Sequence, residues 1–171
     1  MEFEIKNTQV YRLGTAMVHS GNAFNADEIK TDTYPSAHQQ GVCCKLGSTS
    51  TGQGHDNFLQ GIIVQFDMYA PLYMWKQIQR YHFMDFVSSQ STMHTLTKFK
   101  IVERCVSDTD PIILNRYQDM LYNYSTMSDN NLAKPAAWRS LVASLPSGFV
   151  LGASMTTNYR QLKTIYQQRK N

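Results

Sequence analysis

The chain has 171 residues and a formal net charge of +3, a length that fits one domain burying about two thirds of its unfolded surface. With 42% hydrophobic and 17% charged residues the composition excludes disorder, and the small charge does not predict nucleic-acid binding. Its three cysteines form neither a disulfide framework nor a zinc spacing. Because the apolar runs are short, we expect no signal peptide or membrane-spanning helix, and a cytoplasmic protein.

The N-terminal region predicts strands followed by a loop. Residues 1–10 alternate apolar and polar side chains as an edge strand does, and residues 10–18 continue as a second strand. Residues 21–40 are rich in turn-forming residues and predict a loop or a weak helix. Residues 47–54, GSTSTGQG, lack the lysine of a phosphate-binding P-loop, so we expect a flexible connection to His55.

The middle of the chain carries the densest group of polar side chains. An apolar run, residues 61–70, predicts a buried strand, and Pro71 then opens a helix. Its apolar positions are Leu72, Trp75, Ile78, Phe83 and Phe86. Gln77 and Arg80 lie on a neighbouring face of this helix. Residues 86–94 form a loop rich in hydroxyl and amide groups, so we predict a ligand site here.

The second half predicts helices separated by turns, then a strand. Residues 112–124 and 136–145 have apolar side chains at helical spacing, and residues 125–135 between them predict a loop. The second helix ends at Leu145-Pro146-Ser147-Gly148, and residues 149–155 follow as a strand.

The last predicted helix starts after Asn158, which is spaced from Gln161 as capping partners are. At about 100° per residue, two groups of side chains lie on opposite sides of this helix. One group, with a buried stripe, is Asn158, Leu162, Ile165 and Arg169. The other is Arg160 and Thr164. The pattern fits either a solvated surface helix or one that contacts two ligands.

Two distant groups of residues share a joint spacing. His55 lies 25 residues before Arg80, and Pro71 and Gln77 lie nine and three residues before it. The C-terminal pattern is Leu145-Pro146, eleven residues, Asn158-Tyr159-Arg160, and then Thr164 and Arg169. This joint spacing resembles that of the flavin-dependent thymidylate synthases, the ThyX family.

The resemblance implies an α+β fold, a single ThyX-like domain over residues 1–171 with a curved, mostly antiparallel sheet packed by helices. It implies reductive methylation of deoxyuridylate, or of a related pyrimidine nucleotide, with FAD, NADPH and methylenetetrahydrofolate. It also implies a homotetramer whose sites are shared between subunits.

The resemblance further assigns residues to ligands. The positions that contact the flavin in the family match His55, Arg80, Tyr81, His82, Asn158, Arg160 and Thr164. Those that contact the nucleotide match Gln77, Ser91 and Arg169. Arg169 and Ser91 are the candidate catalytic residues, because a cation facing the pyrimidine would stabilise developing charge. The sequence shows no general base that would make Ser91 a nucleophile.

The chain departs from the family at several ligand positions. The Arg-His-Arg signature reads Arg80-Tyr81-His82, and the aligned serine, Ser91, comes one residue late. An acidic residue and two arginines of the family are replaced by Ser89, Met93 and Val142. A charged contact to phosphate is worth about 1.5 to 3 kcal/mol, so these changes weaken the expected hold on a nucleotide. The chain ends two residues after Arg169, where family members continue, which fits a shortened relative or an incomplete chain.

Three functional interpretations follow: an enzyme of this type, a non-catalytic protein that sequesters a nucleotide, and a structural protein that keeps only the scaffold. We expect no metal site, because the spacing of histidines 55, 82 and 94 with Asp56 and Asp85 is not that of metal ligands. The ten tyrosines are spread along the chain, so a stacking platform for nucleic acid is not expected.

Overall fold

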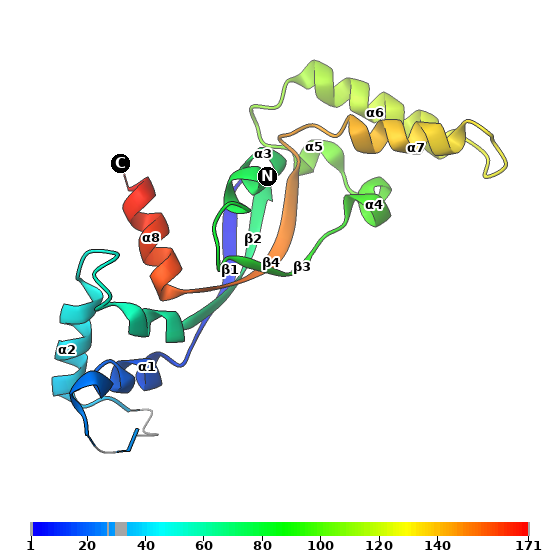
Figure 1. The fold of residues 1–171 in the computed structure, drawn as a ribbon. Helices are drawn as coiled ribbons and strands as arrows, with labels where there is room; N and C mark the ends of the chain where they lie inside the picture. Colours follow the sequence, from blue (N-terminus) through cyan, green and yellow to red (C-terminus); the bar gives the residue numbers. More distant parts are fainter. Residues whose placement is uncertain (1, 27, 30–33, 171) are drawn as a thin grey trace. The chain divides into compact units, whose positions relative to one another are not determined.

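The computed structural model describes residues 2–26, 28–29 and 34–170. It has the predicted α+β class, with a four-stranded antiparallel sheet in the order β1-β2-β4-β3 (Figure 1). The strands are β1 (Glu4–Tyr11), β2 (Ile63–Pro71), β3 (Asp85–Ser89) and β4 (Val150–Asn158). Side chains of the inner strands alternate between buried and partly exposed positions, whereas every residue of the edge strands β1 and β3 is exposed.

The helices are short. They are α1 (Leu13–His19), α2 (Ala37–Gly47), α3 (Leu72–Ile78), α4 (Thr92–Thr95), α5 (Ile101–Arg104), α6 (Pro111–Thr126), α7 (Lys134–Ala143) and α8 (Tyr159–Arg169). The 3₁₀ helices are η1 (Asn22–Phe24), η2 (Asn57–Gly61) and η3 (Leu96–Lys98). Within the part of the chain that the structure describes, none of these helices is both long enough and apolar enough to cross a membrane.

The chain forms two compact units. The first unit comprises Met1–Lys6, Asp67–Arg80 and Val87–Ser154. The second unit comprises Asn7–Phe66, Tyr81–Phe86 and Met155–Asn171. Each of the four strands begins in one unit and ends in the other, so the chain crosses between the units within every strand. It also crosses between Arg80 and Tyr81, after α3.

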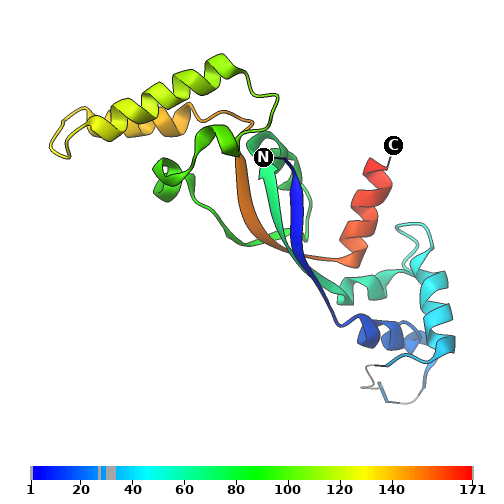
Figure 2. The ribbon, with the colours of Figure 1, turned by 180° about the vertical axis from the view of Figure 1, so that it is seen from behind.

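In the first unit, α6 and α7 lie side by side, as the two opposite views show (Figures 1 and 2). Asp110 accepts a hydrogen bond from the backbone of Ile112 at 2.7 Å and caps α6, whose first residue is Pro111. The buried Tyr117 donates its hydroxyl to the Leu141 carbonyl at 2.8 Å and joins the two helices. Burial raises the pKa of Tyr117 to about 12. The core around it is Leu96, Ile101, Cys105, Tyr117, Leu141 and Phe149.

In the second unit, α1, η2 and the start of α8 share a small core of Ala16, Leu59 and Ile62. Phe58 and Tyr159 pack against it. The Tyr159 backbone donates to the Ile62 carbonyl at 3.1 Å, which fixes where α8 begins relative to η2. The short core therefore anchors the elements that carry the C-terminal polar residues.

Several sequence predictions are confirmed. Residues 1–10 contain the edge strand β1, and the strand expected at 61–70 is β2. The helices expected at 112–124 and 136–145 are α6 and α7, and the strand expected at 149–155 is β4.

One prediction for the N-terminal region was wrong. Residues 10–18 do not form a second strand, because Arg12 adopts a left-handed conformation with φ of 61° that ends β1, and α1 begins at Leu13. The loop or weak helix expected at 21–40 is confirmed for the described residues up to Ser36, which form η1 and irregular chain, whereas residues 27 and 30–33 of that range lie outside the described residues. The regular helix α2 begins only at Ala37. A reciprocal capping box starts it, since Gln39 Oε1 accepts from the Ser36 backbone at 2.8 Å and Ser36 Oγ accepts from the Gln39 backbone at 3.3 Å.

The helix after Pro71 is shorter than predicted. Pro71 closes β2 and precedes α3, which ends at Ile78. Phe83 has φ of 60° and is exposed, and Phe86 lies in β3, so neither belongs to a helical stripe. Residues 86–94, predicted as a loop, instead form most of β3 and the start of α4.

Candidate functional site

The predicted site residues are divided between the two units. The second unit contains His55, Tyr81, His82, Asn158, Arg160, Thr164 and Arg169. The first unit contains Gln77, Arg80 and Ser91.

In the second unit, Asn158 stands where β4 ends and α8 begins. Its Oδ1 accepts a hydrogen bond from the Gln161 backbone at 2.9 Å, so the predicted cap is confirmed. Thr164 donates its hydroxyl to the Arg160 carbonyl at 3.1 Å, one turn earlier in the same helix. The predicted buried stripe is wrong, because Leu162 and Ile165 are only partly buried and no described residue of α8 is fully buried.

A buried carboxylate, which the sequence analysis did not assign to this site, lies against α8. Asp56 directly follows His55 and has 0% of its surface exposed. Lys163 Nζ lies 2.7 Å from Asp56 Oδ2 and also donates to the Thr49 carbonyl. Arg160 Nε lies 3.6 Å from Asp56 Oδ1. The cluster of Asp56, Arg160 and Lys163 thus joins the segment that carries His55 to the helix that carries Arg160.

A signal for this cluster was present in the sequence. Residues 159–169 carry Arg160, Lys163 and Arg169 but no acidic residue, so any carboxylate that pairs with these cations comes from elsewhere in the chain. Arg160 and Lys163 are three residues apart and share one face of a helix. Which carboxylate would meet them was not visible, because Asp56 lies 107 residues before Lys163.

Arg169 reaches a different partner. Its Nε donates to the Tyr81 hydroxyl at 2.9 Å, and its guanidinium carbon lies 6.0 Å from the centroid of the Tyr81 ring. Nine residues separate Arg160 from Arg169, so at about 100° per residue they lie on roughly opposite sides of α8. The structure therefore brings a predicted flavin residue, Tyr81, together with a predicted nucleotide residue, Arg169.

In the first unit, Gln77 and Arg80 are exposed at the end of α3, where the Arg80 backbone donates to the Gln77 carbonyl at 3.3 Å. Ser91 occupies the cap position of α4. Its Oγ lies 2.9 Å from His94 Nδ1, a candidate base that the sequence alone did not pair with Ser91. Ser91 and His94 are three residues apart, and the helix that begins at Thr92 turns this spacing into a contact.

The hydroxyl-rich segment before Ser91 lines a polar pocket of about 290 Å³ on the sheet. Its lining residues are Asp67, Tyr69, Ser88, Ser89, Gln90, Gly152, Ala153 and Ser154. Gln90 and Gly152 exchange two hydrogen bonds of 2.9 Å. A Cβ atom at Gly152 would lie 2.6 Å from the Tyr69 ring, so this close approach requires glycine.

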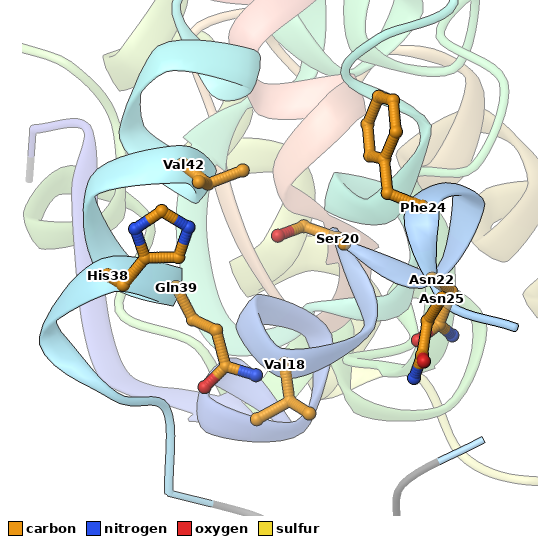
Figure 3. A pocket seen from close by; sticks show the side chains of 9 residues that line it. Val18, Ser20, Asn22, Phe24, Asn25, His38, Gln39 and Val42 are labelled. Atoms are coloured by element: carbon orange, nitrogen blue, oxygen red, sulfur yellow. The ribbon is translucent and has the colours of Figure 1, made fainter. Parts of the chain in front are cut away.

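A second pocket, of about 420 Å³, lies in the second unit beside α1 and α2 (Figure 3). His38, Gln39 and Val42 line it from α2, and Val18 lines it from α1 (Figure 3). None of the predicted site residues lines this pocket. Among the described residues no group of three or more His, Cys, Asp or Glu side chains is placed to hold a metal ion.

No protein-family model and no curated protein sequence matches this chain. Among solved structures, the flavin-dependent thymidylate synthase ThyX of Helicobacter pylori complexed with FAD and dUMP superposes with a TM-score of 0.68 and 14% identity, over 100% of this chain and 85% of that chain. A further structure of that enzyme with FAD and dUMP gives a TM-score of 0.68 and 13% identity over the same shares. The chain has a ThyX-like fold.

A solved structure with a different name also superposes on this chain. The UMP/dUMP methylase PolB of Streptomyces cacaoi, bound with 5-Br dUMP, superposes with a TM-score of 0.57 and 14% identity, over 94% of this chain and 75% of that chain. At these identities the likeness establishes the ThyX-like backbone arrangement alone. Ligands and chemistry have to be argued from the residues of this chain.

Proposed function

We propose that this chain is a flavin-dependent enzyme of the thymidylate synthase type, which reductively methylates deoxyuridylate or a related pyrimidine nucleotide. The observation that carries the proposal is the placement of the C-terminal motif on a ThyX-like fold. Asn158 caps α8, Arg160 meets the segment that carries His55, and Arg169 lies on roughly the opposite side of the helix. That arrangement agrees with one ligand on each side.

The proposed cofactor is FAD, which supplies hydride-transfer chemistry when bound. Its contacts would be His55, Arg80, Tyr81, His82, Asn158, Arg160 and Thr164. The second unit fits such a group, because the two cations of α8 outnumber the one carboxylate that they share, and the net positive charge suits a phosphate-bearing ligand. NADPH and methylenetetrahydrofolate are the proposed hydride and carbon donors.

The proposed nucleotide contacts are Gln77, Ser91 and Arg169. Arg169 would place a cation against the pyrimidine ring, where it stabilises negative charge that develops on a carbonyl. The hydrogen bond from Arg169 to Tyr81 holds that guanidinium through one of its N–H groups. Ser91 would bind the base or a phosphate through its hydroxyl, with His94 accepting or donating at the other side of that hydroxyl.

We further propose that the chain acts in the cytoplasm as one ThyX-like domain over residues 1–171 and assembles as a homotetramer with shared sites. Exposed apolar side chains on the edge strands support association of copies. Ile5 and Val10 of β1 are 50% and 41% exposed, and Val87 of β3 is 60% exposed. Light scattering of the purified protein, with and without FAD, measures the assembly directly.

A non-catalytic nucleotide-sequestering protein is the second candidate. Two arginines of the family are replaced by Met93 and Val142, and the pocket beside β3 is lined by serines and by Asp67 rather than by cations. Such a lining suits hydroxyl and N–H groups of a nucleoside better than a phosphate.

One purification separates the candidates. The enzyme is expected to be yellow, with a flavin absorbance band at about 450 nm. This band is expected to disappear when NADPH is added under anaerobic conditions. Colourless protein that is stabilised by dUMP but not by FAD supports the sequestering protein. If neither ligand raises the melting temperature, both candidates are rejected in favour of a structural role.

A further inference from the structure

The cluster of Asp56, Arg160 and Lys163 holds more positive than negative charge in a largely buried place. Asp56 is fully buried, and the side chains of Lys163 and Arg160 are 15% and 28% exposed. A buried carboxylate is destabilising unless it is paired, and one cation is sufficient to neutralise it. The second cation is therefore an excess charge that the carboxylate does not require.

The two cations contact Asp56 differently. Lys163 makes a short pair with Oδ2 at 2.7 Å and also binds the Thr49 carbonyl, so it is the cation that neutralises Asp56. Arg160 Nε lies 3.6 Å from Oδ1, beyond hydrogen-bond distance, and Oδ1 has no hydrogen-bond partner among the described residues. Arg160 is thus attracted to the carboxylate without donating its N–H groups to it.

The same contacts fasten the segment before η2 to α8. Lys163 binds Thr49 and Asp56, and one turn later Gln167 accepts a hydrogen bond from the Thr51 hydroxyl at 2.5 Å. His55 lies between these attachment points, so its backbone is held against the helix that carries Arg160. His55 and Arg160, which are both proposed to contact the flavin, are therefore held at constant positions relative to each other.

We propose that Asp56 and Lys163 are positioning residues, which orient Arg160 so that its guanidinium presents its donors to a phosphate group of the flavin nucleotide. This inference rests on the proposed flavin-dependent function and names the part of the ligand that this cluster meets. A planar guanidinium whose donors are not used by a carboxylate is suited to two-pronged binding of phosphate.

The decisive variant is Asp56→Asn. A role through net charge and a role in orienting Arg160 predict opposite changes in FAD affinity for this variant. If the cluster acts only through its net charge, removing the carboxylate makes the region more positive and tightens phosphate binding. If Asp56 orients Arg160, the same substitution weakens FAD binding by about tenfold or more, as happens when a residue that orients a ligand-binding side chain is lost. Lys163→Met is expected to weaken FAD as well, and Lys163→Arg is expected to restore most of the affinity.

The affinity is measured by fluorescence titration of FAD into each variant, with inorganic pyrophosphate as a second probe in thermal shifts. The matched control is Asp129→Asn, which breaks the exposed ion pair with Lys134 at 2.6 Å in the first unit. This variant should bind FAD and pyrophosphate as the wild type does. Unchanged or tighter FAD binding by folded Asp56→Asn overturns the positioning role. If the wild type is stabilised by pyrophosphate but not by FAD, the flavin function fails while the positioning role is still tested by the loss of the pyrophosphate effect in Asp56→Asn.

A ligand-free measurement keeps the inference testable if Asp56→Asn binds poorly because it is loosely folded. The Arg160 Nε–H signal in ¹⁵N NMR spectra is expected to exchange readily with water in the wild type and in Lys163→Arg, because Asp56 does not accept a hydrogen bond from this group. It is expected to exchange at least about tenfold more slowly in Lys163→Met, because Asp56 then has no other cation and pairs directly with the guanidinium. Equal exchange in the wild type and Lys163→Met rejects the proposal.

Discussion

The two units place their predicted ligand residues in different surroundings. In the second unit, Arg160 lies against the fully buried Asp56. In the first unit, Gln77 and Arg80 are exposed, and the Ser91 hydroxyl contacts His94, three residues along the chain. The comparison teaches that α8 is joined to distant residues of the second unit, through Asp56 and through Tyr81, before a ligand arrives. Among the described residues, no such long-range side-chain hydrogen bond holds Gln77, Arg80 or Ser91.

The largest expected effect that tests this difference is on stability. Asp56→Asn leaves two cations facing no carboxylate, and breaking a buried pair costs about 3 to 5 kcal/mol. Urea denaturation measures the free energy of unfolding. A loss below about 1 kcal/mol, the range of exposed pairs, would show that the second unit is not held by this cluster.

The two arginines of α8 are expected to separate the ligands. Arg160→Ala should weaken FAD binding, and Arg169→Ala should weaken dUMP binding. Each loss should be about 1.5 to 3 kcal/mol in binding free energy, because each variant removes a charged hydrogen bond. Isothermal titration with each ligand provides the affinities. Tyr81→Phe removes the hydroxyl that binds Arg169 and keeps the cation, so it tests whether the position of Arg169 matters as well as its charge. Arg116→Ala, which removes an exposed arginine of α6, is the matched control. Equal loss of both ligands in both alanine variants of α8 would contradict the division between the faces.

Gly152→Ala probes the pocket of the first unit. The added methyl group would lie 2.6 Å from the Tyr69 ring and 3.2 Å from Gln90 Oε1, and overpacking of this kind costs about 1 to 3 kcal/mol. Thermal denaturation should show the loss, and dUMP affinity should fall if this pocket takes part of the nucleotide. Gly21→Ala is the control, because Gly21 lies outside the helices and a Cβ there meets nothing within 4 Å.

The buried hydroxyl of Tyr117 should make the first unit sensitive to alkaline pH. Burial raises the pKa of Tyr117 from 10.0 to about 12, so the folded state keeps its proton over a range in which the unfolded state loses it. The stabilisation is complete below pH 10 and is lost as the pH rises toward 12. Tyr117→Phe should remove this component of the pH dependence and cost about 1 kcal/mol at neutral pH, because the Leu141 carbonyl loses its donor.

The smallest effect is expected at Ser91. Its hydroxyl contacts His94 at the partly exposed start of α4, so Ser91→Ala should change the free energy of unfolding by less than about 0.5 kcal/mol. The same variant should bind dUMP measurably more weakly if the proposed nucleotide contact is correct. A large stability loss would show that the first unit is as firmly preorganised as the second.

Local patterns accounted for much of the fold. Helical spacing predicted α6 and α7, and the spacing of Asn158 and Gln161 predicted the cap of α8. The predictions failed where backbone conformation overrode pattern. Arg12 and Phe83 adopt positive φ values that end one strand and separate α3 from β3, and apolar spacing carries no information about such turns.

The sequence by itself determined the strands β2 and β4, the helices α6 and α7, and the placing of Arg160 and Arg169 on opposite sides of one helix, because these depend on residues a few positions apart. Only the tertiary structure decided which groups meet those arginines. Asp56 lies 107 residues from Lys163, and Tyr81 lies 88 residues from Arg169. Contacts across such separations depend on how the elements pack, and no local pattern of charge or hydrophobicity specifies them.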